Sequence, residues 1–232
     1  MGQIFLVRHG QASFGQANYD QLSELGTQQA RLLGRWFAQQ NQQFQRVICG
    51  DMRRHEQTAA ACLAELTQNS ADHESDAGFN EYNHHEVLVR HRPAFAEPGA
   101  IQKYLRSTPN PQRAFQQEFQ LAMARWMSGQ QDADYSETWS QFRLRCVTAL
   151  QRVHAAAQPS QDIIVFTSGG TIATLCQHLL GIPDQQMVEL NWNLANAAVT
   201  KLFYQPDQLA LSYLNNFSHL ELLGEAGSIT YR

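Results

Sequence analysis

The chain has 232 residues, of which 43% are hydrophobic and 16% charged, and 17 Lys and Arg against 21 Asp and Glu give a net charge of −4. This balance excludes a disordered chain and argues against bulk affinity for nucleic acid or an anionic membrane surface. The length corresponds to one domain with a sizeable insertion or to two small domains, because domains average about 150 residues.

The first predicted element is a buried strand over 4–7, an apolar run that ends at Arg8-His9-Gly10. Ser23 then offers an N-cap for an amphipathic helix, and a second strand is predicted over 47–49. Apolar residues at helical spacing predict a second helix from about Arg54, and a polar loop is expected over 69–76.

The pattern changes between about 84 and 135, where prolines break the chain into short pieces and apolar residues around 115–126 predict a helix. We interpret this segment as an inserted, mainly helical cap. A long amphipathic helix is predicted over 136–157, and the clearest buried strand over 163–166.

The strand over 163–166 turns into a helix that Gly181 and Pro183 end, and 197–204 and 209–217 alternate like two paired antiparallel strands. Helices interleaved with buried strands predict a three-layer α/β/α fold. Its central sheet is mixed and mostly parallel, and it carries the helical cap as an insertion.

Four cysteines, at positions 49, 62, 146 and 176, lie in apolar stretches without a Cys-x-x-Cys pair, which predicts buried free thiols. The apolar run at the N-terminus is too short for a signal peptide, and polar residues follow it too soon. No apolar run approaches the roughly 20 residues of a membrane span. We therefore expect a soluble, cytoplasmic protein that binds neither membrane nor nucleic acid.

Groups suited to one phosphate follow three predicted strands: Arg8-His9, Arg53-Arg54, and the turn at Ser168 and Gly169. The carboxyl ends of parallel strands meet at the ligand-binding edge of a sheet, so these groups should converge. A His with one ring nitrogen held as N–H can act as a nucleophile, Arg pairs with phosphate oxygens, and a helix start offers backbone N–H groups. Each group alone is more often a surface His or a solvated helix start.

Glu81 and the pair His84-His85 are further candidates. A carboxyl group near a phosphoryl leaving group can donate the proton that the leaving oxygen needs, although a lone Glu is usually a surface charge. Two interpretations of the histidine pair stay open. In one, His84 or His85 reaches the phosphate; in the other, both are surface residues of the cap. A zinc site would need another His at position 89, which is Val89, so no metal is expected.

Five blocks in order along the chain resemble the histidine phosphatase superfamily, which has the phosphoglycerate mutase-like fold: LVRHGQA, LSELGTQQARLLG, GDMRRHEQTA, FNEY and VFTSGGTIATL. The resemblance runs from Ile4 to about Leu180, 194–199 resembles a late strand of the family, and the cap has no recognisable counterpart. It implies a single domain over 1–232 that needs no metal or organic cofactor.

The resemblance also implies roles for particular residues. His9 matches the phosphate-accepting His, Arg8 and Arg54 match the phosphate-binding arginines, and Glu81 matches the proton donor. Arg53 is then a bystander.

Three features depart from the family pattern. Ser168 stands where the family usually has a second phosphate-binding His, and Ala12 and Gly15 replace polar residues of the first block. The long insertions with which mutases grip phosphoglycerate are not recognisable. The first departure predicts slow turnover unless His84 or His85 compensates, and the other two argue against mutase activity.

We therefore predict a phosphatase that hydrolyses phosphomonoesters through a phosphohistidine on His9, with Glu81 as proton donor and Ser168 and Gly169 completing the phosphate site. The substrate is expected to be a small phosphorylated molecule or a phosphoprotein. Two alternatives are mutase-type phosphotransfer and a catalytically impaired member that binds phosphate or a partner. The substrate's identity and the oligomeric state stay open.

Overall fold

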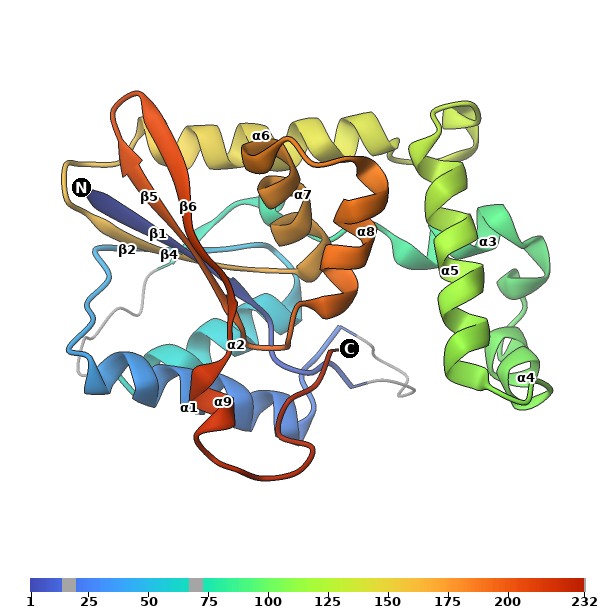
Figure 1. The fold of residues 1–232 in the computed structure, drawn as a ribbon, viewed down its shortest axis with the longest axis horizontal. Coiled ribbons are helices and arrows are strands. Elements are labelled where there is room, and N and C mark those ends of the chain that lie inside the picture. The colour runs from blue at the N-terminus through green and yellow to red at the C-terminus, as the bar shows by residue number, and fades with distance from the viewer. Residues whose placement is uncertain (14–19, 67–72, 232) are drawn as a thin grey trace.

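The computed structural model describes residues 1–13, 20–66 and 73–231 (Figure 1). The expectations for Gly15 and for the first part of the loop over 69–76 fall outside these residues.

A mixed sheet forms the middle layer of the structure. Its strands in the described residues are β1 (Gly2–Arg8), β2 (Arg46–Cys49), β3 (Glu74–Ser75), β4 (Asp162–Thr167), β5 (Val199–Gln205) and β6 (Gln208–Asn216). They lie in the order β3-β2-β4-β1-β5-β6. The first four in this order are parallel, and β5 is antiparallel to both β1 and β6.

Helices cover both faces of the sheet and extend beyond it (Figure 1). One face carries α1 (Glu24–Gln39), α2 (Arg53–Leu63) and α9 (Ser218–Glu221). The other carries α6 (Trp139–Ala155), α7 (Gly169–Leu180) and α8 (Asp184–Asn193), and the cap beside it contains α3 (His84–His91), α4 (Ala100–Arg106) and α5 (Pro111–Met127). Short 3-10 turns η1 (Ala77–Phe79), η2 (Pro93–Ala96) and η3 (Asp132–Asp134) connect them. The predicted α/β/α fold with a mixed sheet is confirmed.

The alternation of side chains along β1 divides the hydrophobic core into two clusters. Ile4 and Leu6 belong to the cluster shared with α6 and α7, whereas Phe5 and Val7 belong to the cluster under α1 and α2. All four residues are at most 3% exposed. A strand buried on both faces is apolar at every position, which explains why 4–7 is a continuous apolar run.

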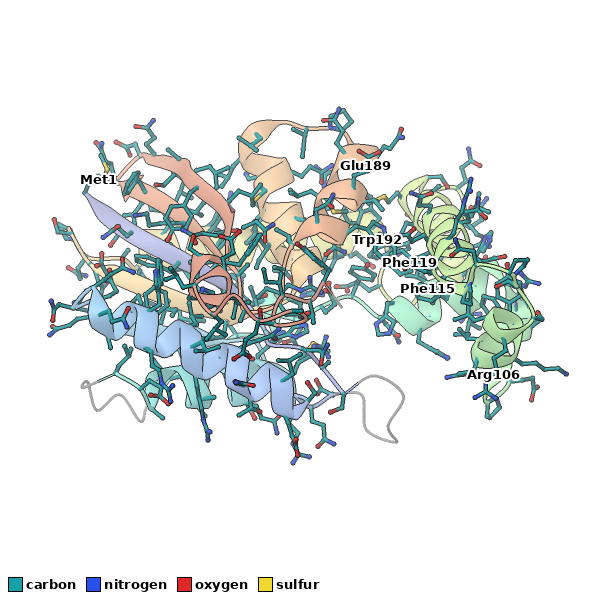
Figure 2. The ribbon with its side chains drawn as sticks, turned by 60° about the horizontal axis from the view of Figure 1, so that its bottom comes forward. Met1, Arg106, Phe115, Phe119, Glu189 and Trp192 are labelled. Carbon is teal, nitrogen blue, oxygen red and sulfur yellow. The ribbon has the colours of Figure 1, made fainter. Side chains whose placement is uncertain are left out.

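Aromatic side chains join the cap to α8 (Figure 2). The rings of Phe115 and Phe119 on α5 have their centroids 6.4 and 5.3 Å from that of Trp192 on α8. The cap therefore packs against the part of the chain that leads from α7 into β5. That the cap is an insertion in a single domain stays a prediction.

The termini of α1 and α7 follow the predicted capping rules. The Ser23 hydroxyl accepts the Gly26 N–H at 3.0 Å at the start of α1, and Gly181 ends α7 with a φ of 66°. The left-handed conformation favours glycine, which has no Cβ to clash with the backbone.

Three short elements differ from the sequence-based expectations. Glu74 and Ser75 form β3, so the prediction of a loop over 69–76 was wrong at these two positions. The helices α8 and α9 were not predicted. α8 buries Met187 and Val188 among polar residues, which gives no clear helical periodicity.

The four cysteines are buried and free, as predicted. In the parts of the chain that the structure describes, no helix is both long and apolar enough to cross a membrane.

His219 on α9 should make stability depend on pH. It is 4% exposed beside Trp36, with the ring centroids 6.1 Å apart, and burial lowers its pKa to about 4. Between pH 6.5 and 4 the unfolded chain binds a proton at this position that the folded protein does not. Its contribution to stability is therefore lost as the pH falls through this range.

We expect that His219→Phe reduces the loss of unfolding free energy between pH 7 and pH 5 by about 2 kcal/mol. Urea unfolding of the variant and the parent protein at the two pH values measures this difference. An equal loss in both proteins would show that His219 is protonated as readily when folded as when unfolded.

Candidate active site

His9 stands directly after β1, at the edge where the carboxyl ends of the parallel strands meet. Neighbouring strands fix its backbone: its N–H donates to the Thr167 carbonyl at 2.9 Å, and its carbonyl accepts from the Ala197 N–H at 3.2 Å. The side chain is buried, and Nδ1 lies 2.7 Å from the Gly10 carbonyl oxygen. A carbonyl only accepts hydrogen bonds, so Nδ1 carries the proton and Nε2 keeps its lone pair.

The surroundings of His9 keep its ring neutral. Burial lowers the pKa of His9 well below its usual range, and the positive charges of Arg54 and Arg8 lower it further. A second proton would place a third positive charge in a buried site. Near pH 7 the Nε2 atom is therefore free to act as a nucleophile.

Arg8, the last residue of β1, is held by backbone carbonyls from distant parts of the chain. Its guanidinium donates to the Leu194 carbonyl and, at 3.2 Å, to the Tyr231 carbonyl. A Cβ placed on Gly169 would lie 3.2 Å from Arg8 Nε, so the guanidinium packs against the first residue of α7. Its charge and the N-terminus of a helix therefore meet at one point, where both favour an anion.

Arg54, in the first turn of α2, brings a second positive charge to this edge. Its side chain is 4% exposed and forms a 2.9 Å ion pair with Asp20. Asp20 also accepts the backbone N–H of Arg53 at 3.0 Å, whereas Arg53 itself is exposed. Asp20 therefore sets the direction of the buried guanidinium and separates it from its exposed neighbour.

Glu81 follows η1 and reaches the start of α7. Its Oε2 accepts the Gly170 N–H at 3.0 Å, and a Cβ at position 170 would lie 2.2 Å from Oε1, so this approach requires glycine. Burial raises the pKa of Glu81, and the hydrogen bond from Gly170 and the charges of Arg54 and Arg8 oppose this only in part. A carboxyl group with a raised pKa can hold a proton and release it to a leaving group.

Ser168 is the N-cap residue of α7 and is fully buried. Its hydroxyl makes no capping bond but lies 2.6 Å from Nε2 of His55, the third residue of α2. His55 is also fully buried, and its ring centroid lies 5.8 Å from that of His9. Two glycines begin α7. The N–H of Gly170 donates to Glu81, and Gly169 lies beside the Arg8 guanidinium.

The two cap histidines occupy different surroundings. His85 is exposed, whereas His84, the first residue of α3, is partly buried. Burial lowers the pKa of His84 to about 4, with smaller contributions from the charges of Arg54 and His85. His84 begins α3 in the cap, and its auxiliary role stays a prediction. Within the described ranges, no group of three or more His, Cys, Asp or Glu side chains is arranged to hold a metal ion.

The structure brings most of the candidate residues from the sequence to one edge of the sheet. These are Arg8, His9, Arg54, Glu81, Ser168 and Gly169. Ala12 is buried and forms a bridge with Leu22, and Gly15 lies outside the described residues.

Sequence reasoning missed Asp20, His55 and the carbonyls that hold Arg8. The signal for His55 was its position directly after Arg54 in a helix start that is otherwise polar. The carbonyls of Leu194 and Tyr231 leave no local signal, because every residue has a carbonyl and these lie far along the chain.

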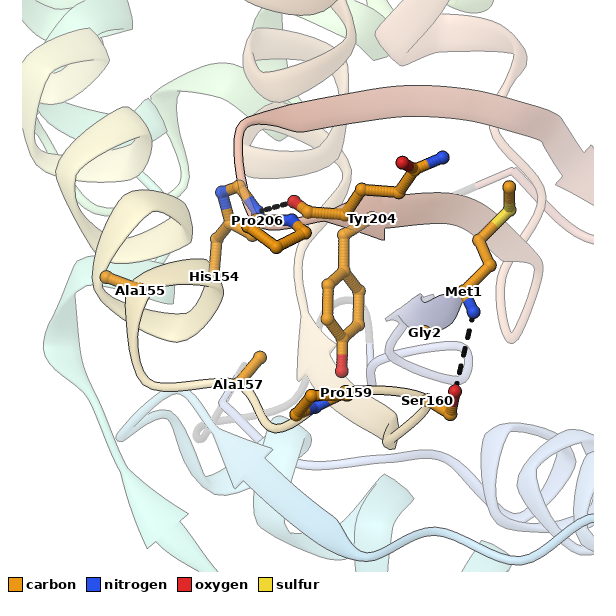
Figure 3. A pocket seen from close by; sticks show the side chains of 10 residues that line it. Met1, Gly2, His154, Ala155, Ala157, Pro159, Ser160, Tyr204 and Pro206 are labelled. Atoms are coloured by element: carbon orange, nitrogen blue, oxygen red, sulfur yellow. Dashed lines mark hydrogen bonds between the residues drawn. The ribbon is translucent and has the colours of Figure 1, made fainter.

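A cavity of about 270 Å³ lies at the opposite edge of the sheet, where β1 and β4 begin (Figure 3). Its polar side chains bond to the protein itself: His154 Nε2 donates to the Gln205 carbonyl at 2.6 Å, and the Tyr204 hydroxyl donates to the Gln158 carbonyl at 2.7 Å. Ligands of open α/β sheets bind at the carboxyl ends of the strands, so the edge that carries His9 is the candidate site.

The electrostatic account of His9 can be tested by NMR titration of its ring. In the parent protein we expect His9 to remain neutral at pH 6.5, where an ordinary His is half protonated. Arg54→Gln removes a cation close to the ring and should raise its pKa. Arg53→Gln changes an exposed neighbour and serves as the matched control, with no shift expected. An ordinary His9 titration in the parent protein would contradict this account.

Comparisons with known proteins agree with this fold. A phosphoglycerate mutase from Bacillus anthracis superposes with a TM-score of 0.67 at 19% identity, over 97% of each chain. A phosphoserine phosphatase from Entamoeba histolytica, in complex with phosphoserine, gives 0.66 at 16% identity over 95% of this chain and 100% of that one. A mycobacterial glucosyl-3-phosphoglycerate phosphatase superposes with a TM-score of 0.59 at 19% identity, over 93% of this chain and 99% of that one.

At these identities the similarity establishes the fold and no more. No curated protein sequence matches the chain. The sequence profile of the histidine phosphatase superfamily (branch 1), however, matches residues 4–217, which is most of the chain. The chain therefore belongs to the histidine phosphatase superfamily.

Proposed function

We propose that this protein is a phosphatase that hydrolyses phosphomonoesters through a phosphohistidine intermediate on His9. The observation that carries the proposal is the state of the His9 ring. Its Nδ1 proton is held by the Gly10 carbonyl, which leaves the Nε2 lone pair available beside two buried arginines.

In the first step, His9 Nε2 attacks the phosphorus atom while the bond from phosphorus to the leaving oxygen breaks. Arg8 and Arg54 offset the negative charge on the phosphoryl oxygens, which is the main contribution that a protein makes to phosphoryl transfer. Glu81 in its protonated form gives its proton to the leaving oxygen, and the alcohol departs. The raised pKa of Glu81 supports this role.

In the second step, water attacks the phosphorus atom of phosphohistidine and the N–P bond breaks. Glu81, now a carboxylate, takes a proton from the water, and the neutral His9 ring is restored. Inorganic phosphate leaves, and Glu81 is protonated again for the next turnover. These steps consume one water molecule and need no cofactor.

One feature of the first block favours hydrolysis over mutase chemistry. A mutase must hold its intermediate for back-transfer and keep water away. The first block instead carries the buried, apolar Ala12 in place of a polar residue. A non-catalytic phosphate-binding protein would not need a proton donor, yet Glu81 lies at the same site as His9, Arg8 and Arg54.

The substrate is proposed to be a small phosphorylated metabolite or a phosphoprotein. Two of the structural neighbours are phosphatases whose names point to phosphoserine and glucosyl-3-phosphoglycerate. We propose that the cap selects the leaving group together with α8, which it meets at Phe115 and Trp192.

An aryl phosphate assay tests the proposal. His9→Ala should reduce hydrolysis to the background rate, because it removes the nucleophile. Parent enzyme denatured during turnover should carry phosphate that is labile in acid and stable in base. Full activity in His9→Ala would refute the proposed mechanism.

A second assay separates hydrolysis from mutase activity. Purified protein incubated with 3-phosphoglycerate is expected to form no 2-phosphoglycerate at enzyme concentrations that hydrolyse an aryl phosphate readily. NMR monitors the reaction. Rapid interconversion of the two phosphoglycerates would show that the protein is a mutase and would contradict the proposed phosphatase function.

A further inference from the structure

The turn that leads into Glu81 is bound by an arginine from α6. This helix begins beside the cap and runs along one face of the sheet (Figure 1). Nη1 of Arg145 donates to three carbonyls of the turn, those of Ala77 at 3.0 Å, Gly78 at 3.2 Å and Asn80 at 3.0 Å. Since Asn80 directly precedes Glu81, the guanidinium binds the backbone up to the residue before the proposed proton donor.

Arg145 is itself held in one orientation. Its Nε and Nη2 atoms donate to the two carboxylate oxygens of Glu137 at 2.7 and 2.9 Å, and its guanidinium carbon lies 5.0 Å from the centre of the Phe142 ring. A planar guanidinium bound to both oxygens of one carboxylate cannot rotate without losing a hydrogen bond. The Glu137 carbonyl in turn accepts from Trp126 Nε1 of α5 at 2.9 Å, so the support for Arg145 reaches the cap.

A second set of bonds joins the same turn to the edge of the sheet that carries His9. Thr167, the last residue of β4, donates its hydroxyl to the Phe79 carbonyl, and the Thr171 hydroxyl of α7 donates to the Asn80 carbonyl at 3.0 Å. The turn is therefore bound by two elements, α6 and the junction of β4 with α7.

The contacts of Arg145 do more than pair two charges. The Glu137 carboxylate would suffice as a partner, yet Nη1 is directed to the backbone of the turn, and a charged donor forms a stronger bond to a carbonyl than a neutral one. Although burial alone would lower the pKa of Arg145, the hydrogen bonds to Glu137 and the charges of Glu137 and Glu81 raise it. The guanidinium therefore stays charged, and it acts within electrostatic range of Glu81.

We propose that Arg145 is a positioning residue, which fixes the turn over 77–80 so that the carboxyl group of Glu81 stays where it can reach the leaving oxygen. Glu81 protonates that oxygen in the proposed phosphatase function, on which this inference rests. In this role Arg145 contacts neither the phosphate nor the leaving group, and no proton passes through it. Its effect on the rate should therefore depend on how much the reaction needs an acid.

The leaving group provides a readout that a merely structural role would not change. Phenolate needs a proton as it departs, whereas dinitrophenolate is a stable anion that leaves without one. The constant kcat/KM covers the steps up to departure of the leaving group, so the later hydrolysis of phosphohistidine does not enter it. Loss of the acid should lower kcat/KM for phenyl phosphate and leave kcat/KM for dinitrophenyl phosphate nearly unchanged.

Arg145→Met should lower kcat/KM for phenyl phosphate by on the order of tenfold, because a misplaced acid loses part of the roughly 10²- to 10⁴-fold that general acid catalysis contributes. The value for dinitrophenyl phosphate should fall by at most about twofold. Glu81→Gln should show the same selectivity with a larger loss. On phenyl phosphate the double variant should equal Glu81→Gln within about twofold, because Arg145 acts only through Glu81.

Two further variants separate positioning from general stability. Arg152→Met removes another arginine of α6, whose Nη2 donates to Asp76 at 2.7 and 2.8 Å at the start of the same turn, and it should show no selective loss. Glu137→Gln leaves the guanidinium in place with a weaker partner and should show a selective loss of about threefold. Urea unfolding of each variant gives the folded fraction, and rates are compared per folded molecule.

The outcomes distinguish failure of this inference from failure of the proposed function. Where Glu81→Gln is selective, four results would overturn the inference alone: no loss or an equal loss on both substrates in Arg145→Met, an equally selective loss in Arg152→Met, or losses that multiply in the double variant. If Arg145→Met does not fold, the absence of a selective loss in Glu137→Gln overturns it. A parent protein that hydrolyses neither substrate, or a Glu81→Gln variant that loses both equally, would remove the proposed proton donor and this inference with it.

Discussion

The chemistry proposed for this protein depends on one imidazole that stays neutral between two guanidinium groups. Burial and the charges of Arg54 and Arg8 keep a second proton off His9, and the Gly10 carbonyl decides which nitrogen holds the first. In the proposed mechanism the same two charges attract the phosphoryl group that His9 attacks. Under this proposal, one arrangement both creates the nucleophile and positions its target.

Burying two arginines is unfavourable unless their hydrogen bonds are replaced, and the fold supplies the replacements from distant segments. Asp20 pairs with Arg54, and carbonyls of Leu194 and Tyr231 accept from Arg8. The segment that contains Tyr231 is held in place by the preceding residue, Thr230, whose carbonyl accepts the Asn196 N–H at 2.7 Å. The site is thus complete only when the C-terminal segment has docked against the start of β5.

The sequence was informative about the fold where burial is complete and the pattern is local. Continuous apolar runs located β1 and β4 to within two residues at each end, and Ser23 and Gly181 marked helix ends correctly. It failed for β3, whose two exposed residues have no apolar signal. It also failed for α8, which packs against α7 but has only Met187 and Val188 buried and shows no clear helical periodicity.

The same distinction applies to the candidate site. Arg8, His9 and Arg54 could be proposed because each follows a predicted strand, and Glu81 because it lies in a block that resembles the family. The contact of His55 with Ser168 could not, because it joins residues 113 positions apart and appears only once α2 and α7 are packed against the same edge of the sheet.

The central claim, that Gly10 leaves only Nε2 of His9 available, has a direct measurement. Enzyme containing ¹⁵N-labelled histidine is denatured in base during turnover of an aryl phosphate, and NMR identifies the ring nitrogen that is bonded to phosphorus. The account requires phosphorus on Nε2 of His9. Phosphorus on Nδ1, on Ser168 or on another residue, or no phosphoenzyme at all under rapid turnover, would contradict it.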